Sequence, residues 1–159
     1  MIELGHKVSG NDTLIGGYRD NVPDEAEFFQ VDCCNMEDMA RVMKGSDIVI
    51  HTAATAHEGL SVFSPSFITR NIFEASVTTI SAAVQNKVKR FVYCTSMARY
   101  GNQPHPFTED MIPQPVDPYG VAKVAGEEVL KILCETHGME WNIAVPHRSE
   151  EHTSELQSH

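Results

Sequence analysis

The chain has 159 residues, of which 42% are hydrophobic, and this allows one globular domain with a real core. Its formal net charge of −10 argues against a protein that binds nucleic acid or an anionic membrane surface. No apolar run approaches the length of a membrane span, and the first residues do not form a signal peptide, so the composition favours a cytoplasmic protein.

The first third of the chain predicts two short strands and a helix. Residues 1–8 are typical of a helix end with a glycine C-cap, followed by a weak strand over 7–11. A second strand is expected over 28–31. A helix is expected over 35–44, because Asn35 is a good N-cap and acidic residues follow it in the first turn.

A near-continuous apolar run follows over residues 47–54. We expect a strand over 47–52, in a parallel sheet that is covered on both faces. Ala53 and Ala54 at its end are small enough to let a cofactor approach the backbone. We interpret His51 as a structural residue and His57 as a loop residue.

A long helix is expected over residues 65–86, because apolar residues recur there at helical spacing. Its expected core positions are Phe67, Ile68, Ile72, Phe73, Val77, Ile80 and Val84. A strand over 90–95 and an ordered, non-helical loop over 101–116 with four prolines should follow.

A second long helix is expected over residues 118–137. Asp117 is a good N-cap, Pro118 suits the first helical position, and Gly138 is the expected stop. A strand over 140–145 comes next. The alternation of strands and helices predicts an α/β fold with a parallel sheet and right-handed crossovers.

Three polar side chains are expected to meet at one site. Ser96 follows the strand over 90–95, at the strand end where ligands collect in open α/β sheets. Tyr119 and Lys123 are four residues apart and share one helix face. An ammonium that stabilises the phenolate would lower the pKa of the phenol and make it a base toward an alcohol. The alternative is a surface Tyr and Lys on an amphipathic helix.

Two segments together resemble the extended short-chain dehydrogenase/reductase family. They are Thr95-Ser96-Met97-Ala98-Arg99-Tyr100-Gly101 and Pro118-Tyr119-Gly120-Val121-Ala122-Lys123. Within that family the chain is most similar to NAD-dependent epimerases and dehydratases of the UDP-glucose 4-epimerase type, from Leu4 to about His147. The resemblance implies a Rossmann-like doubly wound parallel sheet. It also implies hydride exchange between NAD and a nucleotide sugar, through a keto-sugar, in a homodimer.

The resemblance also assigns roles to single residues. Ser96, Tyr119 and Lys123 would be catalytic. The cofactor-binding residues would be Asp12, Asp32, Cys33, Ala53, Ala54, Asn71, Thr95, Tyr119 and Lys123. Asp12 stands where the family binds the adenosine ribose, although a solvated turn Asp explains it equally well. Asn71 would support the active-site loop, but the Gly-Thr that usually follows is absent. No metal site is expected.

The resemblance further implies that a strand and a Gly-rich phosphate-binding turn precede residue 1, and that a substrate domain follows. Without that central strand, the sheet should have two extra edges or an apolar gap. Residues 1–147 are thus expected to be a partial NAD-binding domain. Residues 148–159 resemble a translated sequencing adapter. We expect the isolated chain to be inactive and to bind little NAD.

Other activities on the same fold stay open. They are a nucleotide-sugar dehydratase, a reductase, and a non-catalytic NAD(P)-binding scaffold protein. Dehydratases of the family carry Asp-Glu directly after the active-site hydroxyl residue. Met97 and Ala98 occupy those positions here, and neither can transfer a proton. The sequence therefore favours epimerisation or simple oxidoreduction.

The four cysteines include no Cys-x-x-Cys pair and are expected to be reduced and buried.

Overall fold

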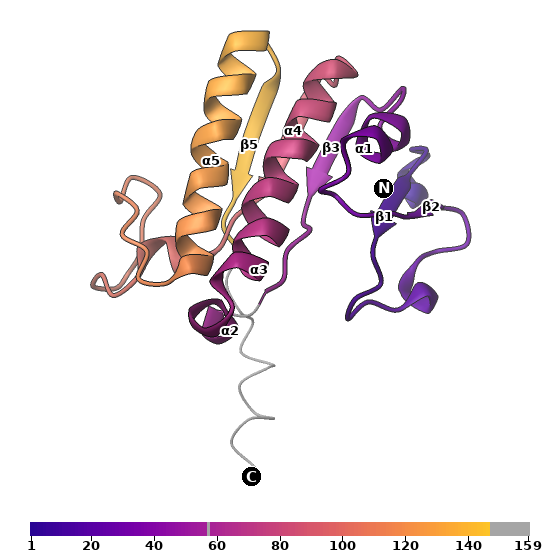
Figure 1. The fold of residues 1–159 in the computed structure, drawn as a ribbon. Coiled ribbons are helices and arrows are strands. Elements are labelled where there is room, and N and C mark those ends of the chain that lie inside the picture. Colours follow the sequence, from indigo (N-terminus) through magenta and orange to yellow (C-terminus); the bar gives the residue numbers. More distant parts are fainter. Residues whose placement is uncertain (57, 147–159) are drawn as a thin grey trace.

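The computed structural model describes residues 1–56 and 58–146, and its strands and helices alternate (Figure 1). The strands are β1 (Ser9–Asp12), β2 (Glu27–Gln30), β3 (Ile48–His51), β4 (Arg90–Cys94) and β5 (Glu140–Ala144). The α-helices are α1 (Met36–Val42), α2 (Glu58–Phe63), α3 (Pro65–Thr69), α4 (Ala75–Gln85) and α5 (Pro118–His137). The other turns of helix are η1 (Ile2–Leu4), η2 (Arg19–Asn21), η3 (Arg70–Glu74) and η4 (Met97–Tyr100). His57 and residues 147–159, with the adapter-like tail, lie outside the described residues.

The strands form two separate parallel sheets. β1 pairs with β2, with Ser9 opposite Glu27. β4 lies between β3 and β5, with Arg90 opposite both Ile48 and Glu140. Among the described residues no strand joins β1 to β3, so each sheet ends in an unpaired edge. The expected parallel α/β fold and the expected break in the sheet are both confirmed.

Helices α4 and α5 lie side by side over the sheet of β3, β4 and β5 (Figure 1). Side chains alternate between the two faces of a strand. Phe91 and Tyr93 on the helix side are completely buried. Ile48 and Ile50 point to the other face and are 49% and 53% exposed. The expectation that β3 is covered on both faces is therefore wrong for the described residues.

The helix expected over 65–86 is not a continuous α-helix. Between α3 and α4 the turn Arg70–Glu74 has π-helical geometry. A π turn inserts an extra residue and rotates the apolar stripe, so one helical period does not fit the whole segment. Ile68, Ile72 and Ile80 are buried as expected, whereas Phe67 is 45% exposed and that core assignment is wrong.

The sequence-based helix caps are confirmed. The Asn35 side chain accepts a hydrogen bond from the Asp38 N–H at 3.1 Å. The Asp117 side chain accepts one from the Gly120 N–H at 2.7 Å. Gly138 ends α5 in the left-handed conformation, with φ of 69°. A glycine is needed there because a Cβ is disfavoured at positive φ.

The cysteine prediction holds only in part. Cys33, Cys34, Cys94 and Cys134 are all free thiols, as expected. Only Cys134, which projects from α5 into the core, is fully buried. The other three are half-buried because they lie at the ends of β2 and β4, where the chain leaves the sheet.

Candidate functional site

Thr95 and Ser96 leave the sheet directly after β4. The Thr95 N–H still bonds to the carbonyl of Ala144 on β5 at 2.9 Å. Ser96 then caps the short helix η4, with its Oγ accepting a hydrogen bond from the Ala98 N–H at 3.2 Å. The hydroxyl of Ser96 is thus held at the carboxyl edge of the sheet, as its position after the strand predicts.

Helix α5 begins against this same turn because Gly120 has no side chain. A Cβ at Gly120 would lie 2.9 Å from the carbonyl oxygen of Ala98. The close approach places Tyr119, one residue earlier, in a buried position. Burial raises the pKa of Tyr119, while the hydroxyl of Ser96 acts in the opposite direction.

Lys123 lies one helical turn beyond Tyr119 and is also buried. Its ammonium donates a hydrogen bond to the carbonyl oxygen of Cys94 at 2.8 Å and lies 5.4 Å from the centre of the Tyr93 ring. Burial lowers the pKa of Lys123 to about 8. The spacing therefore placed both side chains on one face, and that face is turned into the protein.

The expected lowering of the phenol pKa is not present in this structure. The ammonium of Lys123 is bonded to the end of β4, and burial dominates at Tyr119. A buried phenol ionises less readily because the phenolate loses its hydration. The orientation of the Lys123 side chain depends on the tertiary contacts of α5. This orientation explains why the pKa of Tyr119 is not lowered.

Two buried charged residues of the site were missed from the sequence. Glu127 on α5 is completely buried, and its Oε1 accepts a hydrogen bond from the hydroxyl of Thr95. Its Oε2 lies 3.1 Å from Nη2 of Arg99, which is itself nearly buried. Glu127 follows Lys123 by four residues and Tyr119 by eight, so helical spacing alone would have placed it on the same face.

A second buried polar group lies beneath the site, between α4 and the sheet. Nε2 of His51 lies 3.2 Å from the Ser76 hydroxyl, which donates to the carbonyl oxygen of Ile72 at 2.5 Å. The Tyr93 hydroxyl lies 3.3 Å from Ser76 and donates to the carbonyl of Lys123 at 3.4 Å. Burial, with the charge of Lys123, lowers the pKa of His51 to about 3. His51 is therefore a neutral structural residue, as expected.

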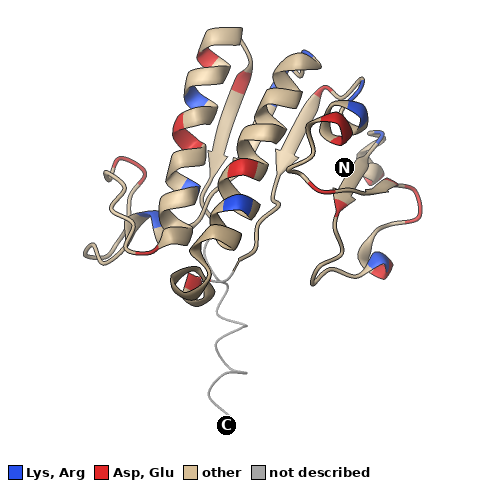
Figure 2. Ribbon diagram, in the orientation of Figure 1, with Lys and Arg blue, Asp and Glu red and all other residues tan. Residues whose placement is uncertain are grey.

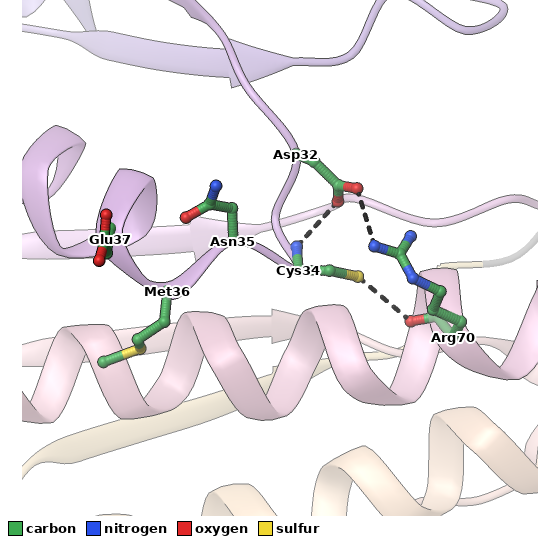
Figure 3. A pocket seen from close by; sticks show the side chains of 6 residues that line it. All are labelled: Asp32, Cys34, Asn35, Met36, Glu37 and Arg70. Carbon is green, nitrogen blue, oxygen red and sulfur yellow. Dashed lines mark hydrogen bonds and ion pairs between the residues drawn. The ribbon is translucent and has the colours of Figure 1, made fainter.

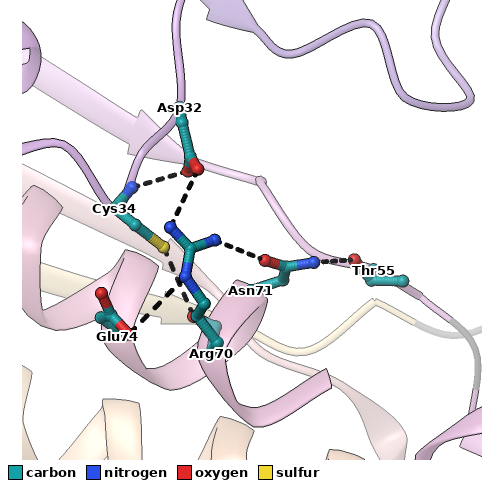
Figure 4. A network of polar contacts seen from close by, with 6 residues as sticks. All are labelled: Asp32, Cys34, Thr55, Arg70, Asn71 and Glu74. Carbon is teal, nitrogen blue, oxygen red and sulfur yellow. Dashed lines mark hydrogen bonds and ion pairs between the residues drawn. The ribbon is translucent and has the colours of Figure 1, made fainter. Parts of the chain in front are cut away.

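The residues after β3 approach Tyr119 from the other side. Ala54 packs against the buried cluster that contains Ile72 and Tyr119. Asn71, in the π turn, donates a hydrogen bond from Nδ2 to the Thr55 hydroxyl at 3.1 Å (Figure 4). Asn71 thus ties the loop after β3 to the helices over the sheet. π turns are frequent at functional sites.

An open pocket of about 530 Å³ lies where β2 ends and α1 begins (Figure 3). It is lined by Asp32, Cys34, Asn35, Met36, Glu37 and Arg70. The Asp32 carboxylate accepts hydrogen bonds from the Cys34 N–H at 2.8 Å and from Nη2 of Arg70 at 3.2 Å. Burial acts to raise the pKa of Asp32, but these bonds outweigh it and the pKa falls below 3.8. Burial and the charge of Asp32 raise the pKa of Cys34 to about 12.

Asp12 ends β1 and Cys33 follows the end of β2, and Asp12 lines a second open pocket, of about 270 Å³. Oδ1 of Asp12 accepts a hydrogen bond from the Leu14 N–H at 2.6 Å, as a turn aspartate does. The Cys33 thiol accepts one from Nδ2 of Asn11 at 3.3 Å. This contact links β1 to the segment that follows β2.

The expected site residues therefore fall into two groups. The group at the carboxyl edge of the larger sheet comprises Thr95, Ser96, Tyr119, Lys123, Ala54 with its neighbour Ala53, and Asn71, which bonds to Thr55 directly after Ala54. Asp12, Asp32 and Cys33 gather at the end of the smaller sheet. Arg70 connects the groups, because its guanidinium contacts both Asp32 and, at 3.2 Å, Oδ1 of Asn71 (Figure 4).

Charged residues are scattered over the described elements (Figure 2). Lys and Arg occur on α1, α5, β4, the short turns η2, η3 and η4 and the loops, and do not gather into one stripe in that part of the chain. Within residues 1–56 and 58–146, no group of three or more His, Cys, Asp or Glu side chains is arranged to hold a metal ion. No described helix is both long and apolar enough to cross a membrane.

Parallel strands with covering helices and polar residues at their carboxyl ends define the Rossmann-like class of fold. The chain belongs to the NAD dependent epimerase/dehydratase family, whose family model matches residues 1–149.

Named relatives within this family carry two different activities. The chain is 29% identical over 143 residues to a UDP-glucose 4-epimerase of Streptomyces lividans, covering 87% of this chain and 44% of the relative. It is 32% identical over 101 residues to a dTDP-glucose 4,6-dehydratase of Streptomyces griseus, covering 63% and 31%.

A solved structure with one of these activities has a similar fold. The fold matches the UDP-glucose 4-epimerase of Thermus thermophilus, solved in complex with NAD, with a TM-score of 0.85 and 28% identity. That match covers 89% of this chain and 47% of the other. The chain thus spans less than half the length of these relatives.

Proposed function

We propose that a protein containing this chain is an NAD-dependent nucleotide-sugar epimerase that works through a keto-sugar. The observation that carries the proposal is the grouping of Ser96, Tyr119 and Lys123 at the carboxyl edge of the larger sheet. The similarity to UDP-glucose 4-epimerases supports the substrate class. The family resemblance also favours a cytoplasmic homodimer, which analytical ultracentrifugation would test.

Each residue of the group has a defined task in this proposal. Tyr119 takes the proton from the sugar hydroxyl, because its phenol lies beside Ser96, whereas Nζ of Lys123 is bonded to the carbonyl of Cys94. Ser96, beside it, donates a hydrogen bond to the reacting oxygen. Lys123 would hold the ribose of bound NAD with its ammonium, which bonds to the carbonyl of Cys94 in this structure. NAD, when bound, supplies the hydride acceptor for the sugar carbon.

The described residues fit the two ends of a dinucleotide. At one end are a small residue, Ala54, and the polar groups of Thr95 and Lys123. At the other end is the open pocket beside Asp32. Among the described residues no glycine-rich turn leads from a strand into a long helix, so the usual donors to a pyrophosphate are not part of this fit.

The residues after Ser96 support epimerisation over dehydration. Loss of water from the sugar needs an acid and a base near the reacting carbon, in addition to Tyr119. Met97 and Ala98 follow Ser96 in η4, and neither side chain ionises. The dehydratase relative therefore belongs to the same family as this chain, but we assign epimerisation rather than dehydration to the protein that contains this chain.

The test uses the longest natural open reading frame that carries residues 1–147. The purified protein is assayed for interconversion of UDP-glucose and UDP-galactose, and Tyr119→Phe is compared with wild type. Loss of the general base should lower turnover by about 10²- to 10⁴-fold. Tyr100→Phe is the matched control, since Tyr100 is also buried and stacks on Phe107, and it should keep its activity.

Two results would contradict the proposal. Near-normal turnover by Tyr119→Phe would mean that another group is the base. Accumulation of a 4-keto-6-deoxy sugar by the wild-type protein would mean that the reaction is a dehydration.

A further inference from the structure

Glu127 is an ionisable side chain that no part of the proposed reaction uses, yet it is completely buried. A buried carboxylate is unfavourable unless it is paired and hydrogen-bonded. Here Oε1 accepts the hydrogen bond of the Thr95 hydroxyl, whereas Oε2 accepts none from the described residues and is paired by charge with Nη2 of Arg99, 3.1 Å away. One carboxylate on α5 therefore holds both ends of the segment Thr95–Arg99.

That segment carries Ser96. Within it, the Ser96 carbonyl accepts the Arg99 N–H at 3.1 Å and the Ser96 hydroxyl accepts the Ala98 N–H at 3.2 Å. The segment is a single turn, so a shift at Thr95 or at Arg99 moves Ser96 with it. Tyr119 and Glu127 belong to one helix, so Glu127 fixes the distance between the two proposed catalytic hydroxyls.

Glu127 also acts on Lys123 through charge. Several groups face Lys123: the carbonyl and thiol of Cys94 and the ring of Tyr93 on β4, neutral His51 on β3, and Glu127 on its own helix. Burial favours the neutral amine, and Cys94 and then the negative charge of Glu127 oppose this. Of the groups just named around Lys123, Glu127 is the one with a carboxylate.

We infer that Glu127 is a positioning residue of the proposed active site, which holds Ser96 beside Tyr119 and sets a carboxylate one helical turn from the buried side chain of Lys123. The inference rests on the proposed function for its catalytic meaning. Its physical content, a carboxylate that controls the Thr95–Arg99 turn and the charge of Lys123, can be measured without turnover.

The first experiment is an NMR titration of the 159-residue chain labelled with ¹³C-lysine and ¹⁵N. Glu127→Gln keeps the shape of the side chain and an acceptor for Thr95 but removes the charge. The pKa of Lys123 should fall below its wild-type value of about 8, and the amide signals of Ser96 and Ala98 should move. Glu128→Gln, which changes an exposed carboxylate at the next position, should leave Lys123 and both amides unchanged.

A double variant distinguishes the positioning role of Glu127 from its role as the counter-charge of Arg99. Glu127→Gln alone leaves Arg99 with no counter-charge and can unfold the chain, whereas Arg99→Met with Glu127→Gln removes both charges. The folded double variant should still show the lowered pKa of Lys123. An unchanged titration of Lys123 in every folded variant that lacks the Glu127 charge would overturn the inference.

The second experiment repeats the variants in the longer reading frame. Turnover in Glu127→Gln and in the double variant should fall at least tenfold, with KM nearly unchanged and the pH profile shifted with Lys123. Full activity in the double variant would overturn the positioning role. A shifted Lys123 titration beside a wild-type protein that converts no nucleotide sugar would overturn the proposed function and leave the charge control by Glu127 standing.

Discussion

Gly126 of α5 lies directly against the hydroxyl of Tyr93 on β4. A Cβ at Gly126 would overlap the phenol oxygen and would lie 3.0 Å from the ring carbon that bears it. The absence of a side chain lets α5 settle onto the sheet, where the Tyr93 hydroxyl reaches the carbonyl oxygen of Lys123 at 3.4 Å. This contact sets the depth of the helix that carries Tyr119, Lys123 and Glu127.

The first prediction is that Gly126→Ala lowers the free energy of unfolding. Overpacking a filled core costs about 1–3 kcal/mol, and the better helix propensity of alanine recovers at most about 1 kcal/mol. Urea denaturation of the 159-residue chain measures the difference. The control is Gly59→Ala in α2, where a Cβ meets no atom within 4 Å and stability should be kept or increased.

A second substitution identifies the cause of that loss. Tyr93→Phe removes the oxygen that an alanine at position 126 would meet first. In a double-mutant cycle, Tyr93→Phe and Gly126→Ala should therefore be less destabilising together than the sum of the two single changes. Strict additivity would show that the contact with the phenol oxygen is not the reason.

The second prediction concerns acid stability and His51. The pKa of His51 is about 3 in the folded chain against 6.5 in the unfolded chain, so between these values only the unfolded state binds the proton. Stability is then present above pH 6.5 and is lost as the pH falls toward 3, by about 1.4 kcal/mol per pH unit. His51→Phe should remove this loss, which is about 2–3 kcal/mol between pH 6 and pH 4.

Urea denaturation at the two pH values measures this effect. His6→Gln removes an exposed imidazole and should keep the wild-type difference between pH 6 and pH 4. An equal acid loss in His51→Phe and wild type would show that other groups cause it.

The third prediction is that Lys123→Met stabilises the chain while it removes a proposed catalytic group. The folded pKa of Lys123 is about 8 against 10.5 unfolded, which corresponds to about 3 kcal/mol at pH 7. Methionine fills similar space without a charge, but the bond to the Cys94 carbonyl is lost, so the net gain should be about 1–2 kcal/mol.

The sign of this effect depends on pH. The free energy of unfolding that wild type loses by burying charged Lys123 is lost in full below pH 8 and is recovered as the pH rises to 10.5. The stability advantage of Lys123→Met should therefore shrink over that interval. Thermal or urea unfolding at pH 7 and pH 10 measures it. A variant that is less stable than wild type at pH 7 would show that the ammonium contributes more through its contacts than it loses by burial.

The fourth prediction concerns NAD and the isolated 159-residue chain. The residues proposed to contact NAD serve only its two ends, and the described residues include no glycine-rich turn for the pyrophosphate, in a chain of formal charge −10. Calorimetric titration with NAD should show no binding in the micromolar range. Adding an N-terminal strand and glycine-rich turn from a relative should introduce binding. Micromolar affinity of the chain alone would show that the turn is dispensable.

Local features of this protein could be predicted from its sequence because they depend on neighbouring residues. Each strand fell near its expected position, and the caps at Asn35, Asp117 and Gly138 formed as their backbone preferences predict. The four-residue spacing of Tyr119 and Lys123 placed them on one helix face. Motif resemblance supplied the family, which the family comparison confirmed.

Only the tertiary structure decided how these elements meet. The π turn at Asn71, the exposed face of β3 and the partnership of Glu127 with Thr95 and Arg99 depend on residues far apart in sequence. The same holds for the direction of the Lys123 ammonium. Burial and long-range contacts set these features, and the sequence pattern of one helix or strand does not contain the surface against which it packs.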